Sequence, residues 1–177
     1  MLDLLLKRRS IRKFKEDKVE VEKIEKIIQG ALLSPSSKNK RPWEFIVVED
    51  KEILEKLSQS KAKGIAFVKD APLAIVVLGE KEVSDVWIED VSIATTLIQL
   101  EAESIGLGSC WAQIRERFHD DNRSASDFIR EVLNIPEDLE VECVVAIGYG
   151  DEEKRPYDLE RLKYEKVHMG EYGKSFK

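Results

Sequence analysis

The longest regular pattern in the sequence is an apolar helix over residues 85–105. Apolar side chains recur along it at helical spacing, and a second apolar row leaves only a narrow polar strip. A helix with so little polar surface must be covered on most sides, either by its own domain or by another subunit. It carries no candidate catalytic group, so we expect it to act as a scaffold. The main stripe consists of Trp87, Val91, Ala94, Ile98, Ala102 and Ile105.

Strand patterns stand on both sides of this helix. Residues 73–78 form an unbroken apolar run between a proline and a glycine, which is typical of a strand buried on both faces. Residues 43–48 and 139–147 alternate in the manner of strands. Together with the short segment after the long helix, they predict a layered α/β or α+β protein with four core strands. Further helices are expected at residues 2–9, 20–33, 51–57 and 127–133.

Length and charge limit the function classes. A chain of 177 residues fits one domain, and a net charge of −6 without a basic block argues against a nucleic-acid partner. No run of eighteen apolar residues and no signal peptide is visible, so we expect no membrane segment. Cys110 and Cys143 resemble small buried hydrophobes of a reducing compartment, which makes the cytoplasm the expected location.

The first candidate site is a cluster of five cations within residues 7–13. Such a cluster is often a solvated face. Here Arg8 and Arg12 stand four residues apart, and the apolar Ile11 and Phe14 anchor the segment between and beyond them. Because an arginine presents a rigid fork of donors that matches phosphate oxygens, this density of charge in an acidic protein points to a phosphate.

The second candidate site is the loop over residues 34–42, which joins an amphipathic helix to a strand. Its prolines fix the backbone, while Ser36, Ser37 and Asn39 supply short polar side chains that bond to the backbone or to a ligand. A rigid loop of this kind suits a planar polar molecule. The alternative is an ordinary helix-to-strand connection.

Several other sites are excluded. Residues 106–111 lack the third glycine of a dinucleotide fingerprint and follow a helix where that motif follows a strand. His119 has no partner at metal-ligand spacing, so no metal site is expected. The sequence contains no nucleophile elbow, P-loop or defensible pair of catalytic carboxylates. From its residue type alone, Trp111 would be a core aromatic.

The order of these segments resembles the nitroreductase family of flavoproteins over roughly residues 4–167. The resemblance rests on Arg8-Arg-Ser-Ile-Arg-Lys-Phe14, on Pro35-Ser-Ser-Lys-Asn-Lys-Arg-Pro-Trp43 and on Gly106-Leu-Gly-Ser-Cys-Trp111. It implies an α+β, three-layer fold over residues 1–177, with a mostly antiparallel sheet wrapped by helices. It also implies that residues 151–177 form a C-terminal extension exchanged with a partner subunit.

The resemblance implies a binding site for FMN. Arg8 and Ser10 would bind its phosphate and ribityl chain, Arg12 would reach its pyrimidine edge, and the end of the strand after Gly108 would pass beside its ring with a backbone N–H near N5. From the tail, Arg161 matches the family's phosphate-binding cation best, and Lys163 second. The full set of expected cofactor-binding residues is Arg8, Arg9, Ser10, Arg12, Pro35, Ser36, Ser37, Asn39, Trp111, Ala112, Gln113 and Arg161, with Ile114 alongside.

The implied activity is an FMN-dependent oxidoreductase. It would take hydride from NADH or NADPH and pass electrons by a ping-pong mechanism to a nitroaromatic, quinone or flavin acceptor, with no catalytic side chain. A homodimer with FMN at its interface is expected. Alternatives are a binding module without turnover, or a relative that dehalogenates, fragments flavin or oxidises azolines. Arg41 stands where many relatives carry Gln, which predicts an anionic acceptor or the phosphate of NADPH near the site.

Overall fold

The computed structural model describes residues 1–177 and contains a four-stranded sheet in the order β1-β2-β4-β3. All neighbouring strands are antiparallel, with β2 and β4 at the centre. The expected strands are therefore confirmed, and so is the antiparallel sheet. The strands are β1 Trp43–Val48, β2 Leu73–Glu80, β3 Gly108–Gln113 and β4 Leu139–Gly148.

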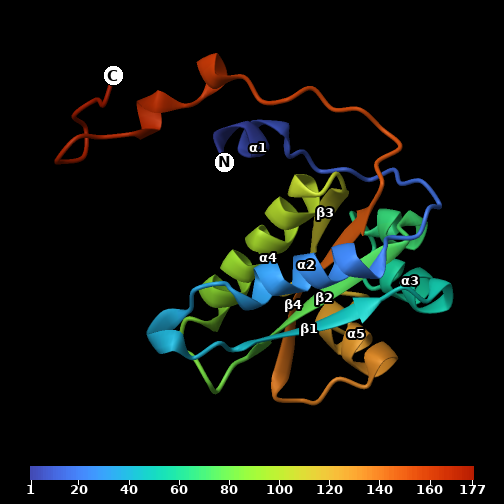
Figure 1. Ribbon diagram of the computed structural model, residues 1–177. Coiled ribbons are helices and arrows are strands. Elements are labelled where there is room, and N and C mark those ends of the chain that lie inside the picture. The colour runs from blue at the N-terminus through green and yellow to red at the C-terminus, as the bar shows by residue number, and fades with distance from the viewer.

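Helices cover both faces of the sheet and give the expected α+β architecture (Figure 1). The α-helices are α1 Leu2–Lys7, α2 Val21–Leu32, α3 Lys51–Ser58, α4 Trp87–Ser104 and α5 Ala125–Leu133. Short 3-10 helices are η1 Ser37–Asn39, η2 Ala66–Asp70, η3 Leu159–Arg161 and η4 Tyr164–Lys166. One core lies between the sheet and α2 with α4, and the other lies between the sheet and α3, η2 and α5.

Capping residues define the starts of two helices. Asp50 accepts hydrogen bonds from the N–H groups of Glu52 and Ile53, and thereby begins α3. Ser124 accepts one from the Asp127 N–H and begins α5. Because a cap satisfies donors that have no partner within the helix, these two boundaries were readable from the sequence.

The long helix α4 is covered by the sheet, α2 and α1, but not over its whole surface. Its main stripe packs into the core, where Val91, Ala94, Ile98 and Ala102 are fully buried. In the second apolar row, Ile93 is 43% exposed, and Leu97 is half-buried. None of the helices combines the length and apolarity needed to cross a membrane. The sequence left open whether this helix is covered by its own domain or by another subunit. Its own domain covers only part of it.

Strand β4 departs from its predicted alternation. Leu139 and Val141 join the core on the α3/α5 side, whereas Cys143 and the later odd-numbered residues join the core on the α4 side. The cause is a bulge: Val77 pairs with Cys143 and Leu78 pairs with Val141, which leaves Glu142 as the extra residue. Side chains alternate between the two faces of a strand, so one extra residue moves all later side chains to the opposite face. The odd-numbered residues before and after the bulge therefore point to opposite sides of the sheet.

The N-terminal segment extends the sheet beyond its edge strand β3. Ser10 bridges Ser109 in parallel, and the Ile11 N–H donates to the Ser109 carbonyl oxygen over 3.0 Å. This approach depends on Gly108, because a Cβ at this position would lie 2.9 Å from the Ile11 Cβ. The cations of residues 8–12 are thus held at a fixed place along β3.

We expect Gly108→Ala to lower the free energy of unfolding by about 1–3 kcal/mol, because an added methyl group overpacks the Ile11 side chain. Thermal unfolding measures the effect. Gly150→Ala is the matched control, since its added Cβ would meet the same Ile11 side chain at an ordinary 3.4 Å. Equal losses in the two variants would contradict a specific need for glycine at position 108.

The C-terminal segment runs from β4 across the end of the molecule and past α1 (Figure 1). Its early part is tied to the N-terminus, because the Tyr157 N–H donates to the Leu6 carbonyl oxygen over 2.8 Å. Beyond this, Tyr164 stacks with Phe176, and His168 packs against Tyr172 within the segment itself. Several large apolar side chains stay exposed there: Tyr157, Leu159, Leu162, Val167, Met169, Tyr172 and Phe176.

Candidate functional site

Arg8 and Arg12 of the N-terminal segment lie near Cys110, in the middle of β3. Burial raises the pKa of the Cys110 thiol, and the Arg12 guanidinium, the Ser10 hydroxyl and the Arg8 guanidinium each offset part of that rise. These three predicted site residues therefore lie together beside the edge strand. Neither Arg8 nor Arg12 forms an ion pair with an acidic side chain. Carboxylates do lie nearby, since Glu152 accepts from the Arg12 backbone N–H over 2.6 Å and Glu103 lies beside Arg8, but neither is within ion-pair distance of a guanidinium, so both guanidinium groups can still donate to a ligand.

Lys61 joins this group at the end of β3. Its Nζ donates to the Gln113 carbonyl oxygen over 2.7 Å. Burial lowers the pKa of the Lys61 ammonium group, the nearby Arg117 charge lowers it further, and the Cys110 side chain acts in the opposite direction. A half-buried lysine without an acidic partner is costly to keep, which is typical of a functional site.

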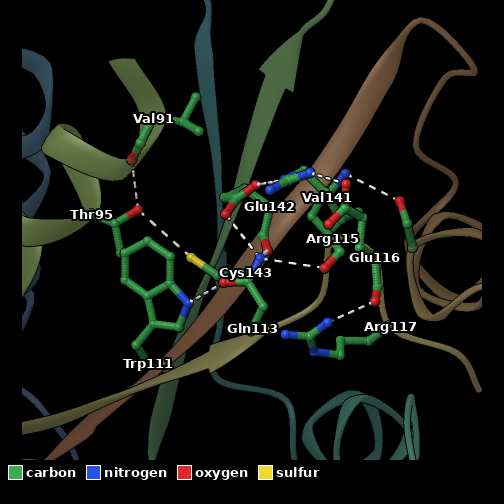
Figure 2. Close-up of polar contacts among 11 residues, drawn as sticks. Val91, Thr95, Trp111, Gln113, Arg115, Glu116, Arg117, Val141, Glu142 and Cys143 are labelled. Atoms are coloured by element: carbon green, nitrogen blue, oxygen red, sulfur yellow. Dashed lines mark hydrogen bonds and ion pairs between the residues drawn. The ribbon is translucent and has the colours of Figure 1, made fainter. Parts of the chain in front are cut away.

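The side chain of Gln113 is occupied within the protein (Figure 2). Its Oε1 accepts from the Trp111 indole N–H over 2.9 Å, and its Nε2 donates to Glu142 Oε1 over 2.9 Å. The Ile114 N–H is also used, because it donates to the Glu142 carbonyl oxygen over 3.0 Å. Lys61 therefore contacts the backbone carbonyl oxygen of Gln113 and not its side chain. Trp111 packs against the core on the α4 side, as its residue type alone suggested.

Glu142, the extra residue of the bulge, holds the end of β3 in place. Its side chain is 4% exposed and accepts from Arg115 Nε over 2.9 Å in addition to Gln113. Its carbonyl oxygen accepts from the N–H groups of both Ile114 and Arg115. Bulges commonly end strand pairing and re-aim side chains beside active sites. Sequence analysis did not identify this residue. The only signal for it was an acidic residue inside a strand of alternating apolar residues.

The second candidate site, the loop at residues 36–41, is fixed by short polar contacts. The Ser37 N–H donates to the buried Asp90 Oδ1 over 2.9 Å. Ser36 Oγ accepts from the Arg41 N–H, and Asn39 Oδ1 accepts from Arg41 Nε, each over 2.9 Å. The loop is therefore shaped before any ligand binds. Asp90 was not among the predicted residues, since nothing local in the sequence links it to Ser37.

The two candidate sites lie at opposite ends of α4 within one chain. Asp90 in the first turn of α4 holds Ser37. Glu103 in the last turn lies beside Arg8, whose charge offsets part of the burial-driven rise in the pKa of the Glu103 carboxyl. With a rise of 1.5 Å per residue, these helix positions are about 20 Å apart. One chain does not bring the two candidate sites together.

Two expected cations of the site lie at other places. The Arg161 side chain is 87% exposed in η3 and lies 3.9 Å from Asp158, away from the cluster around Cys110. Arg9 turns toward the tail, where its guanidinium donates to the Arg155 carbonyl oxygen and lies over the Tyr157 ring. In this chain Arg9 anchors the tail, and Arg161 is exposed beside Asp158.

Two cavities border the N-terminal segment. One of about 660 Å³ is lined by Arg12, Phe14 and residues of α3 and η2. The other, of about 340 Å³, is lined by Arg9, Ile11 and the loop between α4 and β3. Neither of these two includes Lys61 or Gln113. The candidate site around the end of β3 is thus not enclosed by them.

Comparison with known proteins decides the family. The sequence profile of the nitroreductase family matches residues 5–69 and 58–149. The chain belongs to the nitroreductase family. A relative from Archaeoglobus fulgidus described as a putative NADH dehydrogenase/NAD(P)H nitroreductase is 38% identical over 172 residues, with 94% of this chain and 95% of the relative covered. A relative of the same description from Methanothermobacter thermautotrophicus is 37% identical over 172 residues, with 96% of this chain and 86% of the relative covered.

A solved nitroreductase structure agrees with the fold throughout. The FMN-dependent nitroreductase from Clostridium difficile R20291 superimposes with a TM-score of 0.96 and is 55% identical, with 97% of this chain and 100% of that chain covered. The predicted family membership and its fold are therefore confirmed over nearly the whole chain, tail included.

Proposed function

We propose that this nitroreductase is an FMN-dependent oxidoreductase that takes hydride from NADH or NADPH and passes electrons by a ping-pong mechanism to a nitroaromatic, quinone or flavin acceptor. The observation that carries the proposal is the group of cations without acidic partners around Cys110 and Gln113. The family relatives with nitroreductase names support the reaction class.

The residues present fit FMN by the chemistry of their donors. Arg8 and Ser10 provide a guanidinium fork and a hydroxyl beside β3, which suit a phosphate and a polyol chain. Arg12 and Lys61 add two cations beside the same strand, β3, and the Lys61 side chain is half-buried. Positive charge there favours a flavin that gains electrons, because a reduced flavin ring carries negative charge.

FMN supplies the redox chemistry when it is bound, and the protein supplies position and charge. Arg8 and Ser10 would hold the phosphate end of FMN, and Arg12 and Lys61 would hold the anionic edge of its ring. Glu142 fixes the end of β3 beside these residues. No side chain is needed as nucleophile or base, because the flavin carries the hydride chemistry.

A homodimer completes the proposed site. Because Ser36, Ser37 and Asn39 lie about 20 Å along α4 from Arg8, a second chain must bring its own loop to the cluster of the first. A two-fold dimer does this twice and forms two equal sites. The exposed row of α4 and the apolar side chains of the tail give such a dimer surfaces to bury, with residues 151–177 and Arg161 reaching the partner.

An absorbance spectrum followed by anaerobic titration with NADH tests the function. We expect a yellow protein with one FMN per chain that bleaches with NADH and recovers its colour with a quinone or nitroaromatic. A protein that stays colourless after incubation with excess FMN would overturn the proposal. A yellow protein that no reduced nicotinamide bleaches would favour a binding module instead.

Another reaction on the same cofactor is the second candidate. Iodotyrosine deiodinase from Thermotoga neapolitana is 27% identical over 183 residues, with 89% of this chain and 92% of that protein covered. Reductive removal of iodide from an iodotyrosine by the NADH-reduced protein would favour this chemistry. We rank it below nitro or quinone reduction, because the more similar relatives have nitroreductase names.

We expect Lys61→Met to weaken FMN binding about tenfold or more, because a charge-assisted hydrogen bond contributes roughly 1.5–3 kcal/mol. Quenching of FMN fluorescence on titration with apoprotein measures the dissociation constant. Lys63→Met, two residues away on an exposed side chain without an ion pair, is the matched control. An FMN affinity that is equal in both variants would remove Lys61 from the site.

A further inference from the structure

The loop at residues 38–41 carries three cations that the proposed FMN site does not use. Lys38, Lys40 and Arg41 are all exposed, and none forms an ion pair, although acidic residues outnumber basic ones in this protein. The nearest acid in contact with the loop is Asp90, and its two oxygens accept from the Ser37 N–H and the Ser84 hydroxyl. The positive charge of the loop is therefore not neutralised within the chain.

The loop holds these cations in a fixed conformation. Lys38, Asn39 and Arg41 adopt left-handed backbone angles, with φ of 51°, 56° and 51°. Side chains other than glycine rarely adopt this region, and such strain collects at ligand-binding sites. Buried Asp90 and Ser36 Oγ hold the loop at both ends through backbone N–H groups. The shape is thus imposed by the protein before a ligand arrives.

The Arg41 side chain is oriented by a single hydrogen bond. Its Nε donates to Asn39 Oδ1 over 2.9 Å, and its two terminal amino groups have no partner. A guanidinium that is held in this way offers its remaining donors as a pair, which matches two oxygens of one phosphate. A receptor formed in advance loses little entropy on binding.

We propose that the loop formed by Lys38, Lys40 and Arg41 binds a phosphate group of the nicotinamide dinucleotide that delivers hydride. This inference rests on the proposed function, which places the loop beside the flavin of the partner chain. The phosphate has two sources: the pyrophosphate that NADH and NADPH share, and the 2′-phosphate that NADPH alone carries. Arg41 is then a specificity-determining residue for the donor.

The test compares three hydride donors in steady-state assays: NADH, NADPH and the phosphate-free N-benzyl-1,4-dihydronicotinamide. In Arg41→Gln, the ratio of kcat/KM for NADPH to that for the phosphate-free donor should fall about tenfold, because one charge-assisted phosphate contact is lost. The triple Gln variant at positions 38, 40 and 41 should show a larger fall. Lys26→Gln, an exposed cation on α2, is the control and should leave the ratio unchanged.

The outcomes separate the two sources. Equal falls for NADH and NADPH assign the pyrophosphate, and a fall for NADPH alone assigns the 2′-phosphate. Equilibrium titration of the oxidised yellow protein with NAD⁺ or NADP⁺ gives a second readout, in which Arg41→Gln should weaken binding in the same pattern. Unchanged ratios and affinities for both nucleotides would overturn the proposal. Failure of the proposed function is distinguished by the absorbance spectrum, because a protein that does not take up FMN would stay colourless whatever its nucleotide affinity.

Discussion

A heterodimer of Arg12→Ala and Asn39→Ala chains is expected to keep about half of the wild-type activity, although each homodimer loses activity about a hundredfold. In the proposed two-fold dimer, each site takes Arg12 from one chain and Asn39 from the other. One site of the mixed dimer therefore carries both defects, and the other carries none. Co-expression with two different tags and tandem purification isolates this dimer, and steady-state quinone reduction measures it.

The matching control places both substitutions in one chain and pairs it with a wild-type chain. Each site then receives one defect, so this dimer should be nearly inactive. If the two candidate sites instead belonged to separate pockets within each chain, the two results would exchange: the doubly substituted pairing would keep half of the activity and the first pairing would lose it. The two dimers contain the same substitutions, so a general loss of stability cannot produce this difference.

Glu142→Leu is expected to lower the free energy of unfolding by about 3 kcal/mol, because the Gln113 amide loses its 2.9 Å acceptor and the Arg115 guanidinium keeps only the exposed Glu116 as an ionic partner. The partners at stake are the Arg115 guanidinium, 25% exposed, and the Gln113 amide. For a chain of this size, such a loss corresponds to a fall of roughly 6–12 °C in Tm. Thermal and urea unfolding measure it.

Glu140→Leu is the control on the same strand, since Glu140 pairs with Lys81 over 3.3 Å at the surface. An exposed pair contributes only about 0–1 kcal/mol, so this variant should be mild. The double variant Glu142→Leu/Arg115→Leu should recover part of the loss, because it also removes the cation that has lost its buried partner. Equal effects of Glu142→Leu and Glu140→Leu would show that the bulge carboxylate has no special role.

Features that depend on local pattern were predicted well. The boundaries of α3 and α5 follow from their capping residues, and the long helix and the four strands follow from apolar periodicity. The segment from Arg8 to Arg12 was also recognisable, since its charge and its apolar anchors lie within a few residues of one another. A resemblance of short motifs then identified the family that the comparison confirmed.

Features that depend on contacts between distant residues were predicted poorly. The bulge at Glu142 reverses the faces of β4, and it arises from pairing with β2 rather than from any local breaker. Asp90 holds Ser37 across 53 positions, and Lys61 meets the Gln113 carbonyl oxygen across 52 positions. The contacts of the Gln113 side chain with Trp111 and Glu142 were likewise not predicted.

By itself the sequence determined which segments are helices and strands and where cations concentrate, because hydrogen bonding, side-chain period and charge act over a few residues. Only the tertiary structure decided that Lys61 joins Arg12 beside β3, and that the loop around Asn39 lies at the far end of α4. Packing sets those distances, since the sheet register and the length of α4 fix how far apart the two candidate sites stand.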